Sequence, residues 1–313
     1  MASYSSLTHK AVSAGGGTEI AIKEFVYKAA ETGKILYIQA GLHGGETSQW
    51  CLYGLHEFLL KNLKRGEVHV VPYVNPQAWM QRVYYSTFGK FSLIDGKDFN
   101  RGFPGDKAGD VSARIAAAIM DLAKRADLVV DLHTSKSSRP FVVYTQKKYE
   151  HRVKACGFPY NQYSDDAAVL SLQGTFNAAL DVLGVENISI ECGGHDDYNQ
   201  DNINAVLEAI CSLLADMQMV EETENSPKEV YCFEKRKKIF SPCSGLFKAE
   251  KNAGAKIRAG EVVGHIYNAD DLSDVREIRA AFDCVLLTVD SSHIVWEGDI
   301  LAEVVPEDDL VLL

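Results

Sequence analysis

Short, nearly continuous apolar runs, separated by segments with helical periodicity, are the feature that most constrains the fold of this chain. The runs are KILYIQAG (34–41), VHVVPYVN (68–75), DLVVDLH (127–133) and the weaker NISIECGG (187–194). Runs of this kind suit strands that are covered on both faces, as in a parallel sheet. Residues 19–28 partly alternate between apolar and polar side chains and predict a half-buried strand.

Three segments between or after these runs carry apolar residues at helical spacing. They cover residues 47–64, 111–125 and 201–218. Strands that alternate with helices of this length indicate an α/β sandwich. We therefore expect the α/β class, with a mostly parallel mixed sheet sandwiched by helices.

The pattern changes near residue 220. Residues 221–229 (EETENSPKE) are polar and contain a proline, which is typical of a linker. The short apolar runs that follow are separated by Gly, Asp and Ser, and they predict a small all-β domain. We place the boundary at about 225, so that residues 1–225 form an α/β domain and residues 226–313 form a C-terminal β domain.

The charge balance narrows the class of partner. The chain has 32 Lys and Arg residues against 43 Asp and Glu residues, a formal net charge of −11. This argues against a nucleic-acid binder, which needs a basic face for phosphate contacts. A small-molecule partner stays compatible, because a few local arginines can reverse the field inside a cleft.

Cysteine usage and hydropathy indicate the compartment. The seven cysteines are odd in number and include no CxxC pair, so a reducing cytoplasm is the simplest location. The N-terminal residues lack an apolar core of signal-peptide length, and no run of about 18 apolar residues occurs. We expect a cytoplasmic protein without a membrane span, and a homo-oligomer is compatible with the sequence.

The segment GLHGGE (41–46) lies between a predicted strand and a predicted helix, and ligands of open α/β sheets bind beyond the carboxyl ends of strands. His43 and Glu46 are three residues apart, so one turn can aim both side chains at a single ion. His133 ends a second strand at the same predicted edge. Two histidines and one glutamate are the ligand set of a hydrolytic zinc centre. Asp131 is a candidate partner for a ligand histidine.

Two further segments carry candidate catalytic and binding residues. Glu191 lies at the end of another predicted strand, where a carboxylate can take a proton from a metal-bound water and return it to a leaving amine. Arg101 can bind a carboxylate through two parallel hydrogen bonds, and Asn100 can add another. Arg82 can polarise a substrate carbonyl. Cys192, beside Glu191, has no evident histidine partner and favours a buried apolar role.

Ordinary structural roles compete with each of these interpretations. An HxxE pair occurs by chance, a strand-end histidine is often only hydrogen-bonded, and a carboxylate beside glycines can cap a turn. Asn100 and Arg101 can lie in a surface loop with a salt bridge, and Arg82 can be a surface residue. The shared placement of His43, Glu46 and His133 at strand ends favours the metal site.

As an ordered set, the motifs resemble the succinylglutamate desuccinylase/aspartoacylase family of the zinc carboxypeptidase-like superfamily. The matching segments are GxHGxE (41–46), NPxA (75–78), DxNRxFPG (98–105), DLHT (131–134) and ExGG (191–194). The C-terminal residues resemble the β domain that many of these deacylases carry, akin to a biotinyl/lipoyl barrel-sandwich. We find no MKM or DKA triplet for a carrier lysine there.

The resemblance implies a role for each candidate. One Zn²⁺ per chain would be held by His43, Glu46 and His133, and Glu191 would be the general base and acid. Asn100 and Arg101 would hold the carboxylate of an N-acyl amino acid, and Arg82 would polarise the carbonyl.

The sequence thus predicts a zinc-dependent hydrolase that cleaves the amide bond of an N-acyl amino acid or a related small amide. Two alternatives stay open. A metallocarboxypeptidase would use the same ligand set on peptides. A non-catalytic binding protein could keep the same fold, since fold does not guarantee activity.

Overall fold

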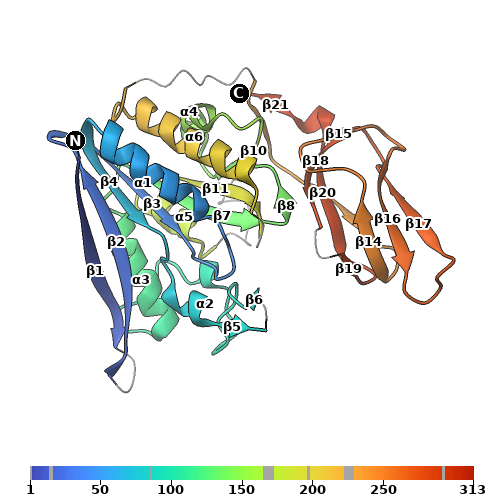
Figure 1. Cartoon of the computed structure of the whole chain (residues 1–313), viewed down its shortest axis with the longest axis horizontal. Helices are drawn as coiled ribbons and strands as arrows, with labels where there is room; N and C mark the ends of the chain where they lie inside the picture. Colours follow the sequence, from blue (N-terminus) through green and yellow to red (C-terminus); the bar gives the residue numbers. More distant parts are fainter. Residues whose placement is uncertain are drawn as a thin grey trace.

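The computed structural model shows a large mixed sheet with helices on both faces, and further antiparallel sheets built from the C-terminal residues (Figure 1). This arrangement confirms the predicted mixed α/β class. The structure describes residues 2–13, 17–84, 86–164, 173–195, 198–221, 229–290 and 293–313.

The large sheet has ten strands in the order β1-β2-β4-β3-β7-β11-β9-β10-β12-β21. Its central pairs β4–β3, β3–β7 and β7–β11 are parallel, whereas the pairs β1–β2, β2–β4 and β11–β9 are antiparallel. The strands are β1 (Ser3–Ser13), β2 (Glu19–Lys28), β3 (Glu31–Ala40), β4 (Arg65–Val71), β7 (Leu128–Ser135), β9 (Phe141–Tyr144), β10 (Tyr160–Tyr163), β11 (Glu186–Gly194), β12 (Tyr231–Phe233) and β21 (Val311–Leu312).

Helices α1, α4 and α6 share one hydrophobic core with one face of this sheet, and α3 and α5 share a second core with the other face. The helices are α1 (Trp50–Asn62), α2 (Pro76–Met80), α3 (Val111–Ala123), α4 (Glu150–Cys156), α5 (Phe176–Val182) and α6 (Gln200–Asp216). Because both faces are covered, β7 is buried almost throughout its length. The four continuous apolar runs of the sequence became β3, β4, β7 and β11, as predicted.

Three features of the sheet have no clear signal in the sequence. Strand β1 is a long edge strand whose residues are mostly exposed, so no apolar alternation marks it. Strands β9 and β10 are only four residues each, too short for a reliable periodicity. Each extends the sheet beyond the strands that the sequence predicted.

The C-terminal residues form two small antiparallel sheets, which confirms that this region is all-β. One sheet orders β13-β20-β18-β15 and the other β17-β16-β14-β19. The strands are β13 (Lys237–Phe240), β14 (Gly245–Ala249), β15 (Lys256–Ile257), β16 (Val262–Asn268), β17 (Val275–Arg279), β18 (Cys284–Val289), β19 (Ile294–Val295) and β20 (Ile300–Pro306). The predicted boundary at 225 lies outside the described residues. On its C-terminal side, β12 and β21 belong to the large sheet.

A short connection fixes the C-terminal sheets against the strand that carries His133. Immediately after β7, the strand β8 (Ser137–Ser138) pairs antiparallel with β18. The Lys136 ammonium also lies 3.3 Å from the Asp290 carboxylate and donates to the backbone carbonyl of Ile300. The C-terminal region is therefore placed to form one wall of any cleft beyond the end of β7.

The state of the cysteines and the character of the helices can also be read from the structure. All seven cysteines are free thiols. None of the helices in the described part of the chain has the length and apolar character that crossing a membrane requires.

A fully buried carboxylate, Glu24 on β2, ties the edge of the sheet to the end of α3. Its oxygens accept from His9 at 2.7 Å, from His69 at 2.8 Å and from Arg125 at 2.9 Å. Burial by itself would raise the pKa of Glu24, but the hydrogen bonds of the two histidines and the charge of Arg125 lower it to about 2. The ionised form of Glu24 is therefore the one that stabilises this edge.

We predict that Glu24→Gln lowers the free energy of unfolding at pH 7 by about 3 kcal/mol, the order expected for such a lowering of the pKa from 4.5. A lowered folded-state pKa contributes stability above the unfolded-state pKa. The contribution is lost as the pH falls from 4.5 toward about 2. Denaturant unfolding of wild type and variant across this range should show their difference shrinking. The exposed Glu57→Gln is the matched control, and equal acid dependence of wild type and Glu24→Gln would contradict the account.

Candidate active site

A cleft of about 590 Å³ opens beyond the carboxyl ends of β7 and β11. His43, Glu46, His133 and Glu191 line it together with Asn100 and Arg101. Ile300 and Glu303 of β20 line it from the C-terminal region. The site therefore lies where open α/β sheets bind ligands, and residues far apart in the chain meet there.

The register of two parallel strands brings His133 and Glu191 together. Strands β7 and β11 pair so that Glu191 lies opposite His133 and Ser189 lies opposite Asp131. Because side chains two residues apart in a strand point to the same face, all four project toward the same side of the sheet. The DLHT and ExGG motifs thus act as one unit across the sheet.

The turn after β3 delivers His43 and Glu46 to the same place. Gly41 has a φ of +72°, and a Cβ atom there would lie 2.6 Å from the indole nitrogen of Trp79. Gly44 donates its backbone N–H to the carbonyl of Gly89 at 2.9 Å. A Cβ atom on Gly89 would lie within 2.2 Å of Gly44. Glycine is therefore needed for both the turn and the close approach of the two backbone segments.

The three predicted ligands converge on one point. One donor atom from each of His43, Glu46 and His133 lies within 4.8 Å of the other two, and all three side chains are buried. The Nδ1 atom of His43 is 2.7 Å from one Glu46 oxygen, and the Nδ1 atom of His133 is 3.1 Å from the other. The structure thus brings together the three residues proposed from the sequence.

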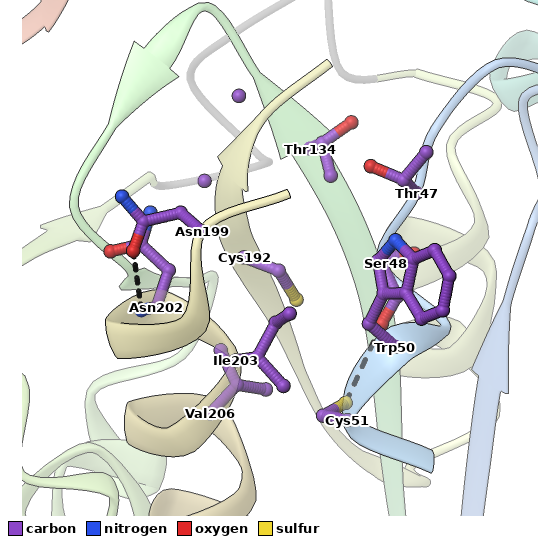
Figure 2. Close-up of a pocket in the computed structure, with 12 residues that line it drawn as sticks. Thr47, Ser48, Trp50, Cys51, Thr134, Cys192, Asn199, Asn202, Ile203 and Val206 are labelled. Carbon is purple, nitrogen blue, oxygen red and sulfur yellow. Dashed lines mark hydrogen bonds between the residues drawn. The ribbon is translucent and has the colours of Figure 1, made fainter. Parts of the chain in front are cut away.

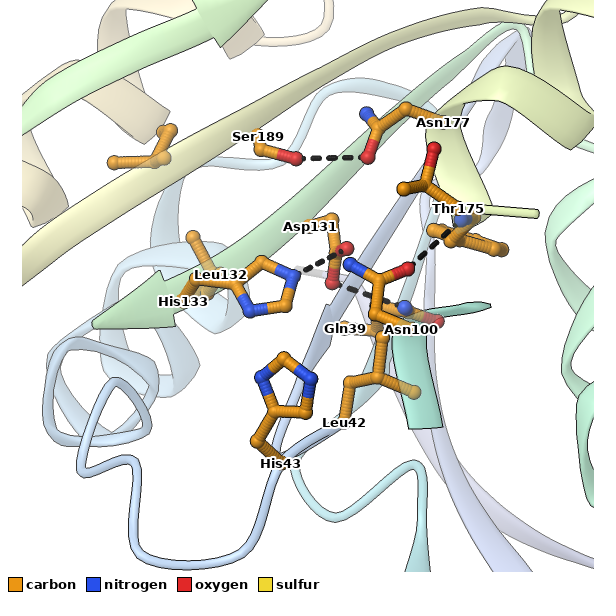
Figure 3. A network of polar contacts seen from close by, with 12 residues as sticks. Gln39, Leu42, His43, Asn100, Asp131, Leu132, His133, Thr175, Asn177 and Ser189 are labelled. Atoms are coloured by element: carbon orange, nitrogen blue, oxygen red, sulfur yellow. Dashed lines mark hydrogen bonds and ion pairs between the residues drawn. The ribbon is translucent and has the colours of Figure 1, made fainter. Parts of the chain in front are cut away.

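A second carboxylate lies behind each histidine. The Nε2 atom of His133 is 2.8 Å from Asp131 (Figure 3). The Nε2 atom of His43 is 3.1 Å from Asp98. Asp131 in turn accepts from the Gln39 amide at 2.9 Å. A carboxylate on Nε2 keeps the proton there, so the Nδ1 lone pairs face Glu46.

The electrostatics of this cluster suit a cation. Burial disfavours the charged forms of His43 and His133, yet the carboxylates around them outweigh it and raise the pKa of both imidazoles. Burial likewise opposes ionisation of Glu46, but the two histidines lower its pKa well below the usual range. The cluster thus stabilises positive charge between two nitrogens and one carboxylate, which is the donor set and field that a divalent metal ion requires.

Glu191 is a carboxylate poised for proton transfer. One of its oxygens, Oε2, is buried and has no hydrogen-bond partner among the described residues. Burial, the largest influence, raises its pKa above the usual value, and the nearby Glu46 carboxylate adds to this. An uncommitted oxygen and a raised pKa are features of a carboxyl group that exchanges a proton with a ligand.

Cys192 points to the opposite side of β11 from Glu191. Its thiol lies in a small pocket between β11 and the first turns of α1 and α6, near Cys51, Ile203 and Val206 (Figure 2). Burial raises the pKa of the Cys192 thiol well above its usual value. A thiolate nucleophile is therefore disfavoured, in agreement with the apolar role that the sequence indicated.

Of the remaining predicted residues, two line the cleft and one does not. Asn100 and Arg101 line the cleft, where the Asn100 side-chain oxygen accepts from the backbone of Phe176 at 2.9 Å. The Asn100 amide nitrogen is therefore oriented as a donor. Arg82 is exposed on the hairpin of β5 (Arg82–Val83) and β6 (Ser86–Thr87), and the described cleft lining does not include it. Its role stays a prediction.

Sequence reasoning missed several contributors. Asp98 precedes Asn100 in the DFNR motif, and its contact with His43 depends on a loop that sequence cannot place. Gln39, which orients Asp131, is a polar residue inside an otherwise apolar run, and that was the one available signal. Arg236 and Glu303 could not be assigned to the cleft, because they reach it only through docking of the C-terminal sheets.

The arrangement of side chains in the cleft indicates a class of protein. A donor set that attracts a cation lies beside a buried carboxylate, which is the combination that metal-assisted hydrolysis uses. A family comparison then identifies the group within this class: the succinylglutamate desuccinylase/aspartoacylase catalytic domain matches residues 32–217. The chain belongs to this family, which indicates a hydrolase of the deacylase type.

Individual relatives agree with this assignment. The N-alpha-acetyl-L-2,4-diaminobutyric acid deacetylase of Halomonas elongata is 26% identical over 300 residues, covering 87% of this chain and 83% of that protein. A structure described as a succinylglutamate desuccinylase/aspartoacylase from Shewanella frigidimarina has a TM-score of 0.85 at 18% identity, covering 100% and 99% of the two chains. The product-bound ectoine utilization protein EutE (DoeB) from Ruegeria pomeroyi has a TM-score of 0.78 at 20% identity, covering 96% and 94%. The two structures share the fold of this chain.

We predict that Asp131→Asn weakens zinc binding by about 10- to 100-fold, because the carboxylate that fixes the His133 tautomer is lost. Competition with a chromogenic chelator measures this directly. Wild type should bind one zinc per chain, and His43→Ala should bind none at micromolar concentration.

The matched control is Asp121→Asn, which removes a surface carboxylate that pairs only with Lys107 and Lys124. It should bind zinc like wild type. Equal affinities for Asp131→Asn and Asp121→Asn would contradict the positioning role of Asp131.

Proposed function

We propose that this protein is a zinc-dependent hydrolase that cleaves the amide bond of an N-acyl amino acid or a related small amide. The observation that carries the proposal is the convergence of His43, Glu46 and His133 beside the uncommitted oxygen of Glu191. We also propose that the large sheet and its helices are a zinc carboxypeptidase-like domain. The C-terminal β domain would then be a barrel-sandwich that narrows the cleft.

His43 and His133, each through Nδ1, and the Glu46 carboxylate would hold one Zn²⁺. When bound there, zinc supplies Lewis-acid polarisation of a carbonyl and lowers the pKa of water to about 7. Asp98 and Asp131 keep the two imidazoles in the tautomer that such binding requires. Several divalent ions suit this donor set, so zinc is part of the proposal.

Glu191 transfers a proton from the attacking water to the leaving amine in the proposed reaction. Its carboxylate takes a proton from the attacking water, and the same carboxyl group then delivers it to the nitrogen of the leaving amine. The raised pKa suits both halves of this exchange, since a strongly acidic carboxyl would be a poor base. The amide C–N bond breaks as the amine becomes protonated, and a carboxylic acid and an amino acid are released.

Asn100 and Arg101 are suited to hold the substrate carboxylate. The Asn100 amide nitrogen is a donor, and within the described residues the Arg101 guanidinium makes one hydrogen bond, to the carbonyl of Asn100 at 2.7 Å. The remaining Arg101 donors are available for an anion. Arg82 is proposed to polarise the substrate carbonyl only if the exposed hairpin moves over the cleft. The named substrate of the Halomonas elongata relative is an N-acetylated amino acid, which supports the same substrate class.

We predict that Glu191→Gln lowers kcat for N-acetyl amino acids by about 10²- to 10⁴-fold, because the proton carrier is lost while the shape of the site is kept. Zinc binding by the variant should match wild type. Steady-state hydrolysis, followed by ninhydrin detection of the released amine, measures the effect.

Two results would contradict the proposal. Faster turnover of blocked dipeptides than of N-acetyl amino acids would favour a metallocarboxypeptidase. Equal inactivity of wild type and Glu191→Gln on a broad acyl-amino-acid panel, with zinc bound, would favour a non-catalytic binding protein on this fold.

A further inference from the structure

Two hydroxyl groups, of Thr145 and Ser189, line the cleft and donate their hydrogen atoms to other side chains of the protein. We call these two residues the floor of the cleft. Thr145 and Ser189 both line the cleft and are buried. Ser189 lies two residues before Glu191 on the same face of β11, so a group bound there would sit beside the proposed reaction centre. Neither residue has a role in the proposed chemistry.

The carboxylate of Asp181 fixes the direction of the hydrogen bonds that three neighbouring side chains make with it. It accepts from the Thr145 hydroxyl, from the Tyr149 hydroxyl at 2.8 Å and from the Asn187 amide at 3.0 Å. A carboxylate with three donors around it can only accept, so the Thr145 hydrogen must point toward Asp181 and away from the cleft.

The orientations of the Asn187 and Asn177 side-chain amides follow from the same argument. Since Asn187 donates to Asp181, its oxygen must accept from Asn177, at 2.7 Å. The oxygen of Asn177 then faces Ser189, which donates its hydroxyl hydrogen at 2.9 Å (Figure 3). Asn187 also donates to the backbone carbonyl of Val185 at 3.0 Å, so Asp181 and this carbonyl together fix the amide orientations and leave one consistent polarity.

As a result, Thr145 and Ser189 present only acceptor lone pairs to the cleft. A carboxylate bound there would face two oxygen atoms that cannot donate a hydrogen bond to it. A buried carboxylate without donors is unfavourable in free energy. A bound ammonium would find two acceptors, with the charge of Asp181 directly behind one of them. This floor therefore distinguishes donors from acceptors.

The cations of the cleft do not cancel this preference. Arg236 donates to the Gln162 side chain and, at 2.9 Å, to Glu303. Lys136 is paired with Asp290. Arg101 follows Asn100 in the loop where the α-carboxylate is proposed to bind. Lys90 lines the cleft too, and its charge acts on Asp98, which lies beside His43. The cleft thus offers donors at Lys90, Asn100 and Arg101 and acceptors at Thr145 and Ser189.

We propose that Thr145 and Ser189, polarised by Asp181, select an N-acyl amino acid whose side chain ends in a hydrogen-bond donor, above all an ammonium group, and disfavour one that ends in a carboxylate. This inference rests on the proposed function and names the substrate side chain within it. Ser189 and Thr145 are specificity-determining residues, and Asp181 is a positioning residue.

The test compares the Nα-acetyl derivatives of L-ornithine, L-norvaline and L-glutamate, whose side chains have similar length and differ in their ends. The zinc-loaded wild type should show a kcat/KM for the ornithine compound at least about tenfold above that for norvaline, the size of a hydrogen bond to a charged group. The glutamate compound should fall below norvaline. Ratios between substrates on one preparation do not depend on the fraction of folded enzyme.

Three variants separate specificity from structure. Ser189→Ala should lower the ornithine-to-norvaline ratio by about tenfold, since one acceptor is lost. Asp181→Asn removes the negative charge behind Thr145 and weakens the hold on its hydroxyl hydrogen, so the glutamate-to-norvaline ratio should rise while the ornithine ratio falls. Tyr149→Phe removes a hydroxyl that bonds the same carboxylate outside the cleft, and it should leave both ratios as in wild type.

Binding of the free amino acids to the metal-free protein by calorimetry gives a readout that is independent of turnover, with ornithine expected to bind more tightly than glutamate. If the glutamate compound is preferred, or the three substrates are equivalent, the inference is wrong while the deacylase function stands. If no acetyl amino acid is hydrolysed, the proposed function fails, and the calorimetric order still decides whether the floor selects donors.

Discussion

Two carboxylates, the half-buried Asp98 and the fully buried Asp131, impose the constraint on which the rest of the site depends. Each holds the Nε2 hydrogen of one histidine, so that two Nδ1 lone pairs and the Glu46 carboxylate face a single point. Such a cluster is unfavourable without a positive charge at its centre, and the raised pKa values of His43 and His133 express this. The fold holds the cluster together because Asp131 and His133 lie on one face of a fully buried strand.

The large sheet and the C-terminal sheets each form part of the cleft. Strands β7 and β11 fix the distance between His133 and Glu191 through their register, which a slip by one residue would destroy. The C-terminal sheets dock beside β7 through β8, and Arg236 and Glu303, which are 2.9 Å apart, line the cleft from this region. Most residues that line the resulting cleft are polar.

Much of this arrangement could be predicted from the sequence, because its signals are local. The apolar runs revealed the central strands, and the position of His43, Glu46, His133 and Glu191 at their ends predicted one edge of the sheet. The signals fail where contacts depend on long-range docking. Asp98 meets His43 through a loop, Arg236 reaches the cleft only from beyond the linker, and the polarity of Ser189 follows from Asp181 through two intervening amides. No periodicity or motif encodes such contacts.

The central claim is that His43, Glu46 and His133 bind one metal ion, with both imidazoles using Nδ1. A crystal structure of the zinc-loaded protein, with anomalous diffraction collected on both sides of the zinc absorption edge, tests this most directly. The account predicts one strong anomalous peak per chain at about 2.0–2.1 Å from both Nδ1 atoms and beside a Glu46 oxygen. A peak bound through Nε2, or a zinc-saturated protein with no peak at these three residues, would contradict it.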